Sequence, residues 1–235
     1  MIGITKIIRQ MKQGQTGPFL CEADDGHKYI VKGARATGTG LVKEWLVGHL
    51  CRGFGLPIPD FKLAYVDNVL VEFDYDDLGA GVCFASQYIY NIQDITVAQR
   101  KRIDKQLLRD LFVFDYWIRN DDRNLTALGG NPNLFIHPQT NGVYVLDHNL
   151  SFEPDFDLDT FNQCHIGAEA WNEKIDFLDN QFYEERFKAS LATLKEAIEQ
   201  LPDEWLEVFD LDSIEAQIKV VLLHYKHTDF WEGIQ

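Results

Sequence analysis

Segments typical of strands and segments typical of helices are separated along this sequence, and that separation limits the folds open to it. Short apolar runs dominate residues 1–90, with one helix among them, whereas residues 91–235 are mostly helical apart from one small hairpin. Strands followed by helices are typical of an α+β fold rather than of alternating β-α units. We therefore expect an α+β chain with one lobe over residues 1–90 and a second over residues 91–235.

The expected elements follow from periodicity and turn residues. The run Asp24-Asp25-Gly26-His27 is a strong hairpin signal, and Gly55 and Pro57 mark the end of the first helix. We expect a helix at 41–54 and strands at 4–9, 18–23, 28–32, 61–66, 69–73 and 83–90. In the second part we expect strands at 134–137 and 143–146 and helices at 97–118, 168–175, 179–200 and 211–226. Asp179 and Asp212 are the expected N-caps of the last two helices.

The charge and the cysteine pattern exclude several classes of partner. The 235 residues carry 22 Lys and Arg against 37 Asp and Glu, a net charge of −15, which repels nucleic acid and anionic lipid. No apolar run approaches the roughly 20 residues of a membrane span, and the first residues lack a signal-peptide pattern. The four cysteines form no C-x-x-C motif. We expect a cytoplasmic protein that binds neither nucleic acid nor membrane.

The stretch from Trp117 to Phe152 is the most informative part of the sequence. Asp122 follows an apolar helix, Asn133 stands directly before an apolar strand, and Asp147 closes the next one. Apolar elements pin the polar residues at their ends, so these side chains should converge. Asn and Asp oxygens suit Mg²⁺, and a further Asp can accept a proton from a hydroxyl nucleophile. Arg123 can orient that Asp or offset its charge, although Asp, Asn, Gly and Pro also form plain turns.

The first part of the chain supplies groups that suit a phosphate. Lys32 ends a strand that follows a Gly-containing turn, and its charge suits an anionic phosphate. Glu44 lies on a largely apolar helix face and requires a cationic partner, for which Lys32 is the obvious candidate. The loop over residues 13–18 could cover phosphates with its N–H groups, but it matches neither a Walker A nor a G-x-G-x-x-G spacing. Plainer readings are an exposed lysine, a solvated glutamate and an ordinary turn.

These segments, taken in order, resemble the small HipA-like kinases, a bacterial branch of the atypical kinases. The matching segments are DDGHKYIVKG, EWLVGHLCRGFGLPIP, FDYWIRNDDR, NPNLFI and VYVLDHNLSF, which span about residues 18–152. The resemblance implies a two-lobed protein-kinase-like fold with a β-rich N-lobe that carries one helix and a mainly helical C-lobe. It also implies the use of ATP with Mg²⁺ or Mn²⁺.

The resemblance further implies a role for each candidate residue. Asp122 would be the catalytic base with Arg123 beside it, and Asn133 and Asp147 would hold the metal. The loop from Asn124 to Gly130 lengthens this region, so Asn124 and Asn131 are rival metal ligands. Lys32 would contact phosphate with Glu44 as its partner. The remaining ATP-binding residues would be the loop residues Gly14, Gln15, Thr16 and Gly17 and the hinge residues Gln87, Tyr88 and Ile89.

The sequence therefore predicts a metal-dependent ATP phosphotransferase, a HipA-like kinase that acts on protein Ser or Thr. Two alternatives stay open. One is a catalytically degenerate pseudokinase or nucleotide-sensing interaction module, and the other is a small-molecule or lipid kinase or a nucleotidyl transferase in the same cleft. The expected partners are a protein or small-molecule phosphate acceptor and a regulatory or antitoxin protein, and the sequence names no acceptor.

Overall fold

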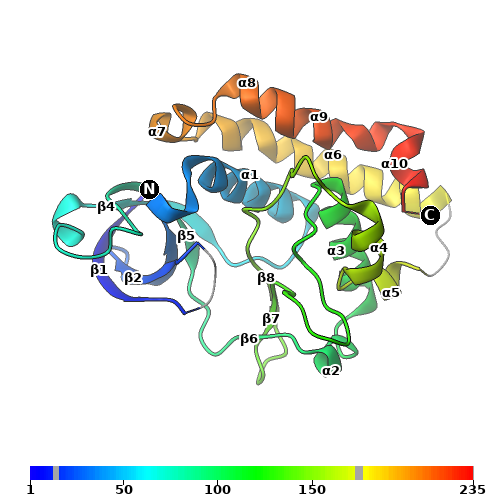
Figure 1. Ribbon diagram of the computed structural model, residues 1–235, viewed down its shortest axis with the longest axis horizontal. Coiled ribbons are helices and arrows are strands. Elements are labelled where there is room, and N and C mark those ends of the chain that lie inside the picture. Colours follow the sequence, from blue (N-terminus) through cyan, green and yellow to red (C-terminus); the bar gives the residue numbers. More distant parts are fainter. Residues whose placement is uncertain (13–15, 173–176, 235) are drawn as a thin grey trace.

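The first strands of the chain close into a barrel (Figure 1). The computed structural model describes residues 1–12, 16–172 and 177–234. The barrel order is β1-β2-β3-β5-β4, in which only the β1–β4 pair is parallel. The strand bounds are β1 Ile2–Gln10, β2 Phe19–Ala23, β3 Lys28–Lys32, β4 Phe61–Val66 and β5 Gly81–Gln87. Closure pairs both edges of the sheet, so the barrel offers no long open edge to another chain.

Small and β-branched side chains fill much of the barrel. Cys21, Val31, Ala64, Val66 and Ala85 are all completely buried. They alternate with outward-facing residues, as the two-residue period of a strand requires. The larger Phe19 and Tyr29 belong to the same core, so small and large side chains share the barrel interior. The predicted β2–β3 hairpin is present, and Gly26 takes a positive φ of 79° at its turn.

Helix α1 (Gly38–Phe54) joins the barrel to the helical part, because it packs lengthwise on α6 (Phe177–Glu199) (Figure 1). Polar side chains of α6 bind backbone carbonyls of α1. Ser190 Oγ donates to the Leu50 carbonyl at 2.7 Å, and Thr193 Oγ1 donates to the His49 carbonyl at 3.2 Å. In return, the Trp45 indole N–H donates to the carbonyl of Ala197 at 2.9 Å. The position of α1 is therefore set by a helix more than 130 residues later in the chain.

The helical part is built around α3 (Lys105–Trp117), whose apolar side chains lie in the larger core. Trp117 packs against Phe187 of α6 with ring centroids 4.4 Å apart, and its indole N–H donates to the Leu222 carbonyl at 2.8 Å. A three-stranded sheet lies beside it, with β6 Gln93–Asp94, β7 Leu134–Ile136 and β8 Val143–Val145. The other helices are α2 Val97–Arg100, α4 Leu158–Cys164, α5 Ala168–Trp171, α7 Asp203–Leu206, α8 Leu211–Ser213, α9 Val220–Leu223 and α10 Thr228–Glu232. Within the described residues, no helix combines the length and apolar character needed to cross a membrane.

Two expected elements differ from the structure, and helix α4 is among the elements that were not expected. The helix expected at 97–118 is two helices, because the Asp104 side chain accepts the Leu107 N–H at 3.0 Å and caps a new start. The strand expected at 69–73 is wrong, since Asn68–Leu70 forms a 3₁₀ turn capped by Asp67. Helix α4 begins after Asp157, whose carboxylate accepts the first free N–H groups.

The helix expected at 211–226 has the expected range, but the N-caps expected for it and for the helix before it differ from those in the structure. Helix α8, a π-helical segment at Ile214–Lys219, α9 and a 3₁₀ turn at His224–Lys226 follow one another over the range expected for one helix. Its N-cap is Asp210, which accepts the Ser213 N–H at 2.8 Å, and Asp212 lies inside the first turn. Asp179 likewise lies inside the first turn of α6. The end of the helix expected at 168–175 lies outside the described residues. The lobe boundary near residue 90 stays a prediction.

We predict that Gly53→Ala lowers stability, although the same change usually stabilises a helix. A Cβ at Gly53 would lie 2.8 Å from the Ser190 Cα atom, so α1 and α6 could not keep their spacing. Overpacking of this kind costs about 1–3 kcal/mol, whereas an unobstructed Gly→Ala change in a helix gains up to about 1 kcal/mol. Urea unfolding measures the difference, and a more stable variant would contradict the close α1–α6 contact.

Candidate functional site

Lys32, Glu44 and Asp147 meet in one ion-paired cluster. Lys32 is the last residue of β3, Glu44 lies on α1, and Asp147 follows β8. The Lys32 ammonium donates to Glu44 Oε1 and, at 2.8 Å, to Asp147 Oδ1. Lys32 and Glu44 are buried, and Asp147 is partly exposed. The structure thus brings together three candidate residues, of which Lys32 and Asp147 are 115 residues apart in the sequence.

The cluster shifts the ionisation of all three groups. Burial alone would lower the pKa of Lys32, but the Glu44 and Asp147 carboxylates outweigh it and raise that pKa above its ordinary value. Burial raises the pKa of Glu44, an effect that Lys32 opposes and Asp147 reinforces. Burial also favours neutral Asp147, but Lys32 prevails and lowers the pKa of Asp147 to about 2. Lys32 therefore stays protonated, and Asp147 stays ionised at neutral pH.

Asp122 lies beside this cluster and holds two of the candidate asparagines. Its Oδ2 atom accepts hydrogen bonds from Asn133 Nδ2 at 2.9 Å and from Asn131 Nδ2 at 2.8 Å. Asn133 is buried and Asn131 is exposed. The third candidate, Asn124, accepts the Asn131 N–H through Oδ1 at 3.1 Å, so its side chain shapes the loop. Burial raises the pKa of Asp122, the two asparagines lower it, and the charge of Asp147 raises it, with a net increase.

Two candidate metal ligands occupy unusual backbone positions. Asn133 has φ of 41° and Asp147 has φ of 63°, both in the left-handed region. Such conformations cost about 1–3 kcal/mol each and persist only where the surroundings impose them. The Leu146 N–H donates to the Asn133 carbonyl at 3.1 Å, which links the two positions across the base of the β7–β8 hairpin.

Arg123 is buried, and its hydrogen bonds go to groups other than the Asp122 carboxylate. Its side chain has no exposed surface and pairs with Asp115 at 2.7 Å. Its Nη1 also donates to the carbonyls of Asn133 and Leu146. Arg123 therefore holds the backbone on both sides of the hairpin, and the structure places its guanidinium out of reach of a substrate.

Sequence reasoning did not identify Asp115, His148 and His165, which complete this network. His165 Nδ1 accepts the Gly167 N–H at 3.0 Å, so the neutral ring donates through Nε2 to Asp115 at 2.9 Å. The His148 ring accepts from Arg123 through Nδ1 at 3.4 Å, and the backbone N–H of His148 donates to Glu44 Oε1 at 3.2 Å. Burial, with Arg123 adding to it, lowers the pKa of His148 to about 3. A signal existed for Asp115, because a charge in a very apolar helix end requires a buried partner.

The loop over residues 13–18, here called the covering loop, is described only from Thr16 onward. Gly14 and Gln15 lie outside the described residues. The Thr16 hydroxyl is buried and finds no hydrogen-bond partner in the described part of the chain. Gly17, with φ of 58°, accepts through its carbonyl from Gln10 Nε2 at 3.4 Å.

The hinge candidates are the last residue of β5, Gln87, and the two residues after it. The N–H groups of Gln87 and Tyr88 donate to the carbonyls of Asp60 and Lys28 at 2.7 and 2.9 Å. These two N–H groups therefore already have hydrogen-bond acceptors within the chain. Ile89 is the next residue, and it is partly buried.

The candidate metal ligands are one carboxylate, Asp147, and one amide, Asn133. Over residues 1–12, 16–172 and 177–234, no three His, Cys, Asp or Glu side chains form a group that could hold a metal. Mg²⁺ is commonly held by one or two carboxylates together with substrate phosphates and water. The Asp147 carboxylate and the Asn133 amide fit that pattern, because an amide that donates through Nδ2 keeps its oxygen as an acceptor. The unpartnered Thr16 hydroxyl fits a phosphate that the covering loop would approach.

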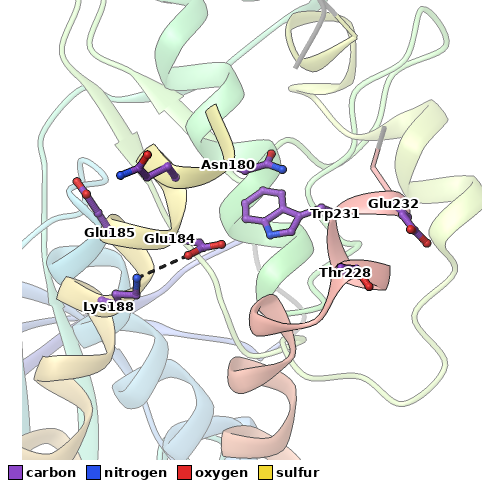
Figure 2. A pocket seen from close by; sticks show the side chains of 8 residues that line it. Asn180, Glu184, Glu185, Lys188, Thr228, Trp231 and Glu232 are labelled. Carbon is purple, nitrogen blue, oxygen red and sulfur yellow. Dashed lines mark ion pairs between the residues drawn. The ribbon is translucent and has the colours of Figure 1, made fainter. Parts of the chain in front are cut away.

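A pocket of about 660 Å³ between α6 and α10 lies apart from this cluster (Figure 2). Trp231 and Thr228 form one wall, and Glu184 pairs with Lys188 at 3.6 Å on the other. None of the candidate site residues lines it.

Comparison with known proteins identifies the class and then the family. Among solved structures, the Helicobacter pylori proinflammatory kinase CtkA matches with a TM-score of 0.54 at 12% identity, over 94% of this chain and 96% of that one. The chain therefore has a protein-kinase-like α+β fold. A sequence profile described as HipA-like kinase matches residues 4–234, and the chain belongs to that family. Both the fold class and the family are as the sequence predicted.

Other solved structures match less closely. A Golgi casein kinase matches with a TM-score of 0.48 at 13% identity, over 98% of this chain and 73% of that one. The Golgi casein kinase with Mn/ADP bound matches with a TM-score of 0.45 at 12% identity, over 97% and 74%. A search of curated proteins finds no match.

We predict that Asp115→Asn strongly destabilises the protein, because it leaves the Arg123 charge buried without a counter-ion. Removal of one partner from a buried ion pair typically costs about 3–5 kcal/mol. The matched control is Asp60→Asn, which removes the exposed partner of Arg52 and should cost no more than about 1 kcal/mol. Equal free energies of unfolding for the two variants would contradict the central role of Arg123.

The same ion pair should make the wild-type protein sensitive to acid. Burial favours neutral Asp115, but Arg123 and His165 prevail and lower the pKa of Asp115 to about 2. The unfolded carboxyl titrates near pH ~3.9, so this contribution is complete above that pH and is lost as the pH falls toward 2. Over this window the unfolding free energy of Asp115→Asn should fall less than that of the wild type.

Proposed function

We propose that this HipA-like kinase is a metal-dependent ATP phosphotransferase that acts on Ser or Thr hydroxyls of proteins. The observation that carries the proposal is the meeting of Lys32, Glu44 and Asp147 from three separate elements, with Asp122 beside them. In kinases, catalysis consists mostly of positioning and electrostatic stabilisation. This arrangement offers a cation, a carboxylate for a metal and a second carboxylate of raised pKa.

Each group has a distinct task in this proposal. Lys32 binds phosphate oxygens, and Glu44 holds the ammonium in place through the buried ion pair. Asp147 and Asn133 hold the metal, with Asn131 as a weaker candidate because it is exposed. A bound Mg²⁺ or Mn²⁺ supplies positive charge that stabilises the phosphates during transfer. The loop over Gly14–Gly17 and the hinge at Gln87–Ile89 enclose the nucleotide.

Asp122 serves the acceptor in this proposal. The acceptor hydroxyl oxygen forms a bond to the γ-phosphorus while the bond from that phosphorus to the β–γ bridging oxygen breaks. ADP leaves, and the hydroxyl proton passes to the Asp122 carboxylate. Asn131 and Asn133 both donate to Oδ2 and so fix the direction of that carboxylate. The raised pKa of Asp122 makes it a stronger base than an ordinary aspartate.

The experiment that tests the proposal separates the two carboxylates. Asp122→Asn should bind Mg·ATP nearly normally and lose roughly 10²–10⁴-fold in kcat, because it removes only the proton acceptor. Asp147→Asn should lose both metal-dependent nucleotide binding and turnover. The control is the neighbouring Asp121→Asn, which should be mild. Phosphate transfer from labelled ATP and nucleotide binding measure the outcomes.

The result also decides between enzyme and interaction module. If the wild-type protein binds Mg·ATP but transfers phosphate to neither protein nor small-molecule acceptors, the phosphotransferase proposal fails. If Asp121→Asn has the large effect instead, the assignment of the base is wrong and the class of activity stands.

We predict that Mg²⁺ with ATP raises the melting temperature more than ATP alone. The charge of Lys32 is already offset by Glu44 and Asp147, so the phosphates need a further cation. A ligand at 100 times its Kd stabilises by about 2.7 kcal/mol, which is roughly 5–10 °C for a chain of this size. Asp147→Asn should abolish the metal-dependent part of the shift. Equal shifts with and without Mg²⁺ in the wild type would count against the site.

A further inference from the structure

A second hollow lies at the C-terminal end of α3, close along the chain to Asp122. It is lined by Tyr116, Trp117, Arg119, Pro154, Phe156, Leu158, Val221, His224 and Phe230. Most of these side chains are apolar, and four are Phe, Tyr or Trp residues that come from three separate segments of the chain. Its volume is about 260 Å³, below the roughly 300–1,000 Å³ of pockets that take drug-sized ligands. The hollow suits one large side chain rather than a nucleotide.

The chain path keeps this hollow near the candidate base. Arg119 precedes Asp122 by three residues, so their Cα atoms lie at most roughly 11 Å apart. The other wall belongs to the segment that follows Asp147. That segment is fixed against the end of α3, because the Phe152 N–H donates to the Ile118 carbonyl at 2.7 Å. A polypeptide with its hydroxyl at Asp122 would therefore have neighbouring residues within reach of the hollow.

Acidic residues border the apolar walls. Along the chain, Phe156 lies between Asp155 and Asp157, and Asp159 follows Leu158. Asp229 precedes Phe230 and pairs with His224 at 3.0 Å. These four aspartates are exposed, whereas the charge offered from the walls is that of Arg119 and, when protonated, His224.

The charges of Asp229 and Arg119 both affect the pKa of Tyr116, which lines the hollow. The Tyr116 hydroxyl donates to the Phe230 carbonyl at 2.9 Å. Burial raises the pKa of Tyr116 to about 12, with Asp229 adding to the increase and Arg119 opposing it. Acidic and basic groups therefore both lie close to the hollow, and the acidic ones are more numerous.

We propose that this hollow, in the proposed kinase function, binds a large apolar side chain of the acceptor protein that is flanked by Lys or Arg. The apolar walls take the side chain, and the aspartates attract the basic neighbours. A site of this kind gives the acceptor its register, since it places one residue in the hollow and a nearby Ser or Thr at Asp122. The overall charge of −15 also favours a basic acceptor segment over an acidic one.

The test uses an arrayed peptide library with a central Ser or Thr, in which each neighbouring position is fixed in turn to each amino acid. Binding to the full chain and phosphate transfer from labelled Mg·ATP are measured separately. We expect selection of Phe, Leu or Met at one position and of Lys or Arg beside it. The preference over Ala should be roughly 10–100-fold, the usual range for an apolar side chain in a pocket.

Matched variants assign the preference to the hollow. Val221→Glu places a charge in the wall and should remove the apolar preference, whereas Val220→Glu changes the exposed neighbour, which lies outside the lining, and should not. Asp155→Lys should weaken the basic preference, and the exposed Asp212→Lys is its control. ATP hydrolysis without acceptor should be unchanged in all four. If Val221→Glu fails to fold, Leu158→Ala tests another wall of the same hollow.

Because peptide binding and phosphate transfer are measured separately, this inference and the proposed function can fail independently. A wild-type protein that binds peptides without sequence preference, or a preference that survives Val221→Glu or Leu158→Ala, overturns the assignment of the hollow. Selective binding that Val221→Glu removes supports it, even if no peptide is phosphorylated. Absence of transfer to every peptide would then count against the proposed function alone.

Discussion

The buried guanidinium of Arg123 is the interaction on which the candidate site depends. Removal of such a charge from water costs several kcal/mol, and good geometry with full hydrogen bonding must offset this cost. Asp115 supplies the counter-charge, and the carbonyls of Asn133 and Leu146 accept from the same guanidinium. Because those carbonyls lie at the two ends of the β7–β8 hairpin, Arg123 sets the separation between Asn133 and Asp147. Arg123 thus acts as a positioning residue for its neighbours.

The second constraint is the packing of α1 on α6. Glu44 can pair with Lys32 only while α1 stays against the barrel, and Ser190 and Thr193 of α6 bind the carbonyls of α1 directly. The His148 N–H, which donates to Glu44 Oε1 at 3.2 Å, adds a link from the segment after β8. Three distant parts of the chain therefore hold one ion pair. A cluster held in this way is formed before any ligand arrives, which reduces the reorganisation that binding requires.

Local signals in the sequence were enough to place the β2–β3 hairpin, α1 and the polar residues at the ends of β7 and β8. The residue types that meet at Lys32, Glu44 and Asp147 could also be named, because each is a charge at the end of an apolar element or on its face. The Asp115–His165 pair could not, since a loop conformation fixed by tertiary contacts brings them together. The helix restart at Asp104 was missed because no Gly or Pro in the stretch 97–118 marks a break. The hollow beside α3 depends on side chains from three segments, and no local pattern encodes it.

The charges of the cluster show what a chain with a net charge of −15 would still need in order to bind a polyanion. Lys32 faces two carboxylates, so with Glu44 ionised the cluster carries about one negative charge, and with Glu44 protonated it is close to neutral. Neither state attracts phosphates strongly by itself. Burial raises the pKa of Glu44, so a proton and a metal ion are alternative ways to balance the same group of charges. On this argument a metal ion held by Asp147 would take the place of part of its interaction with Lys32, and the Lys32 ammonium would then be free to bind phosphate oxygens.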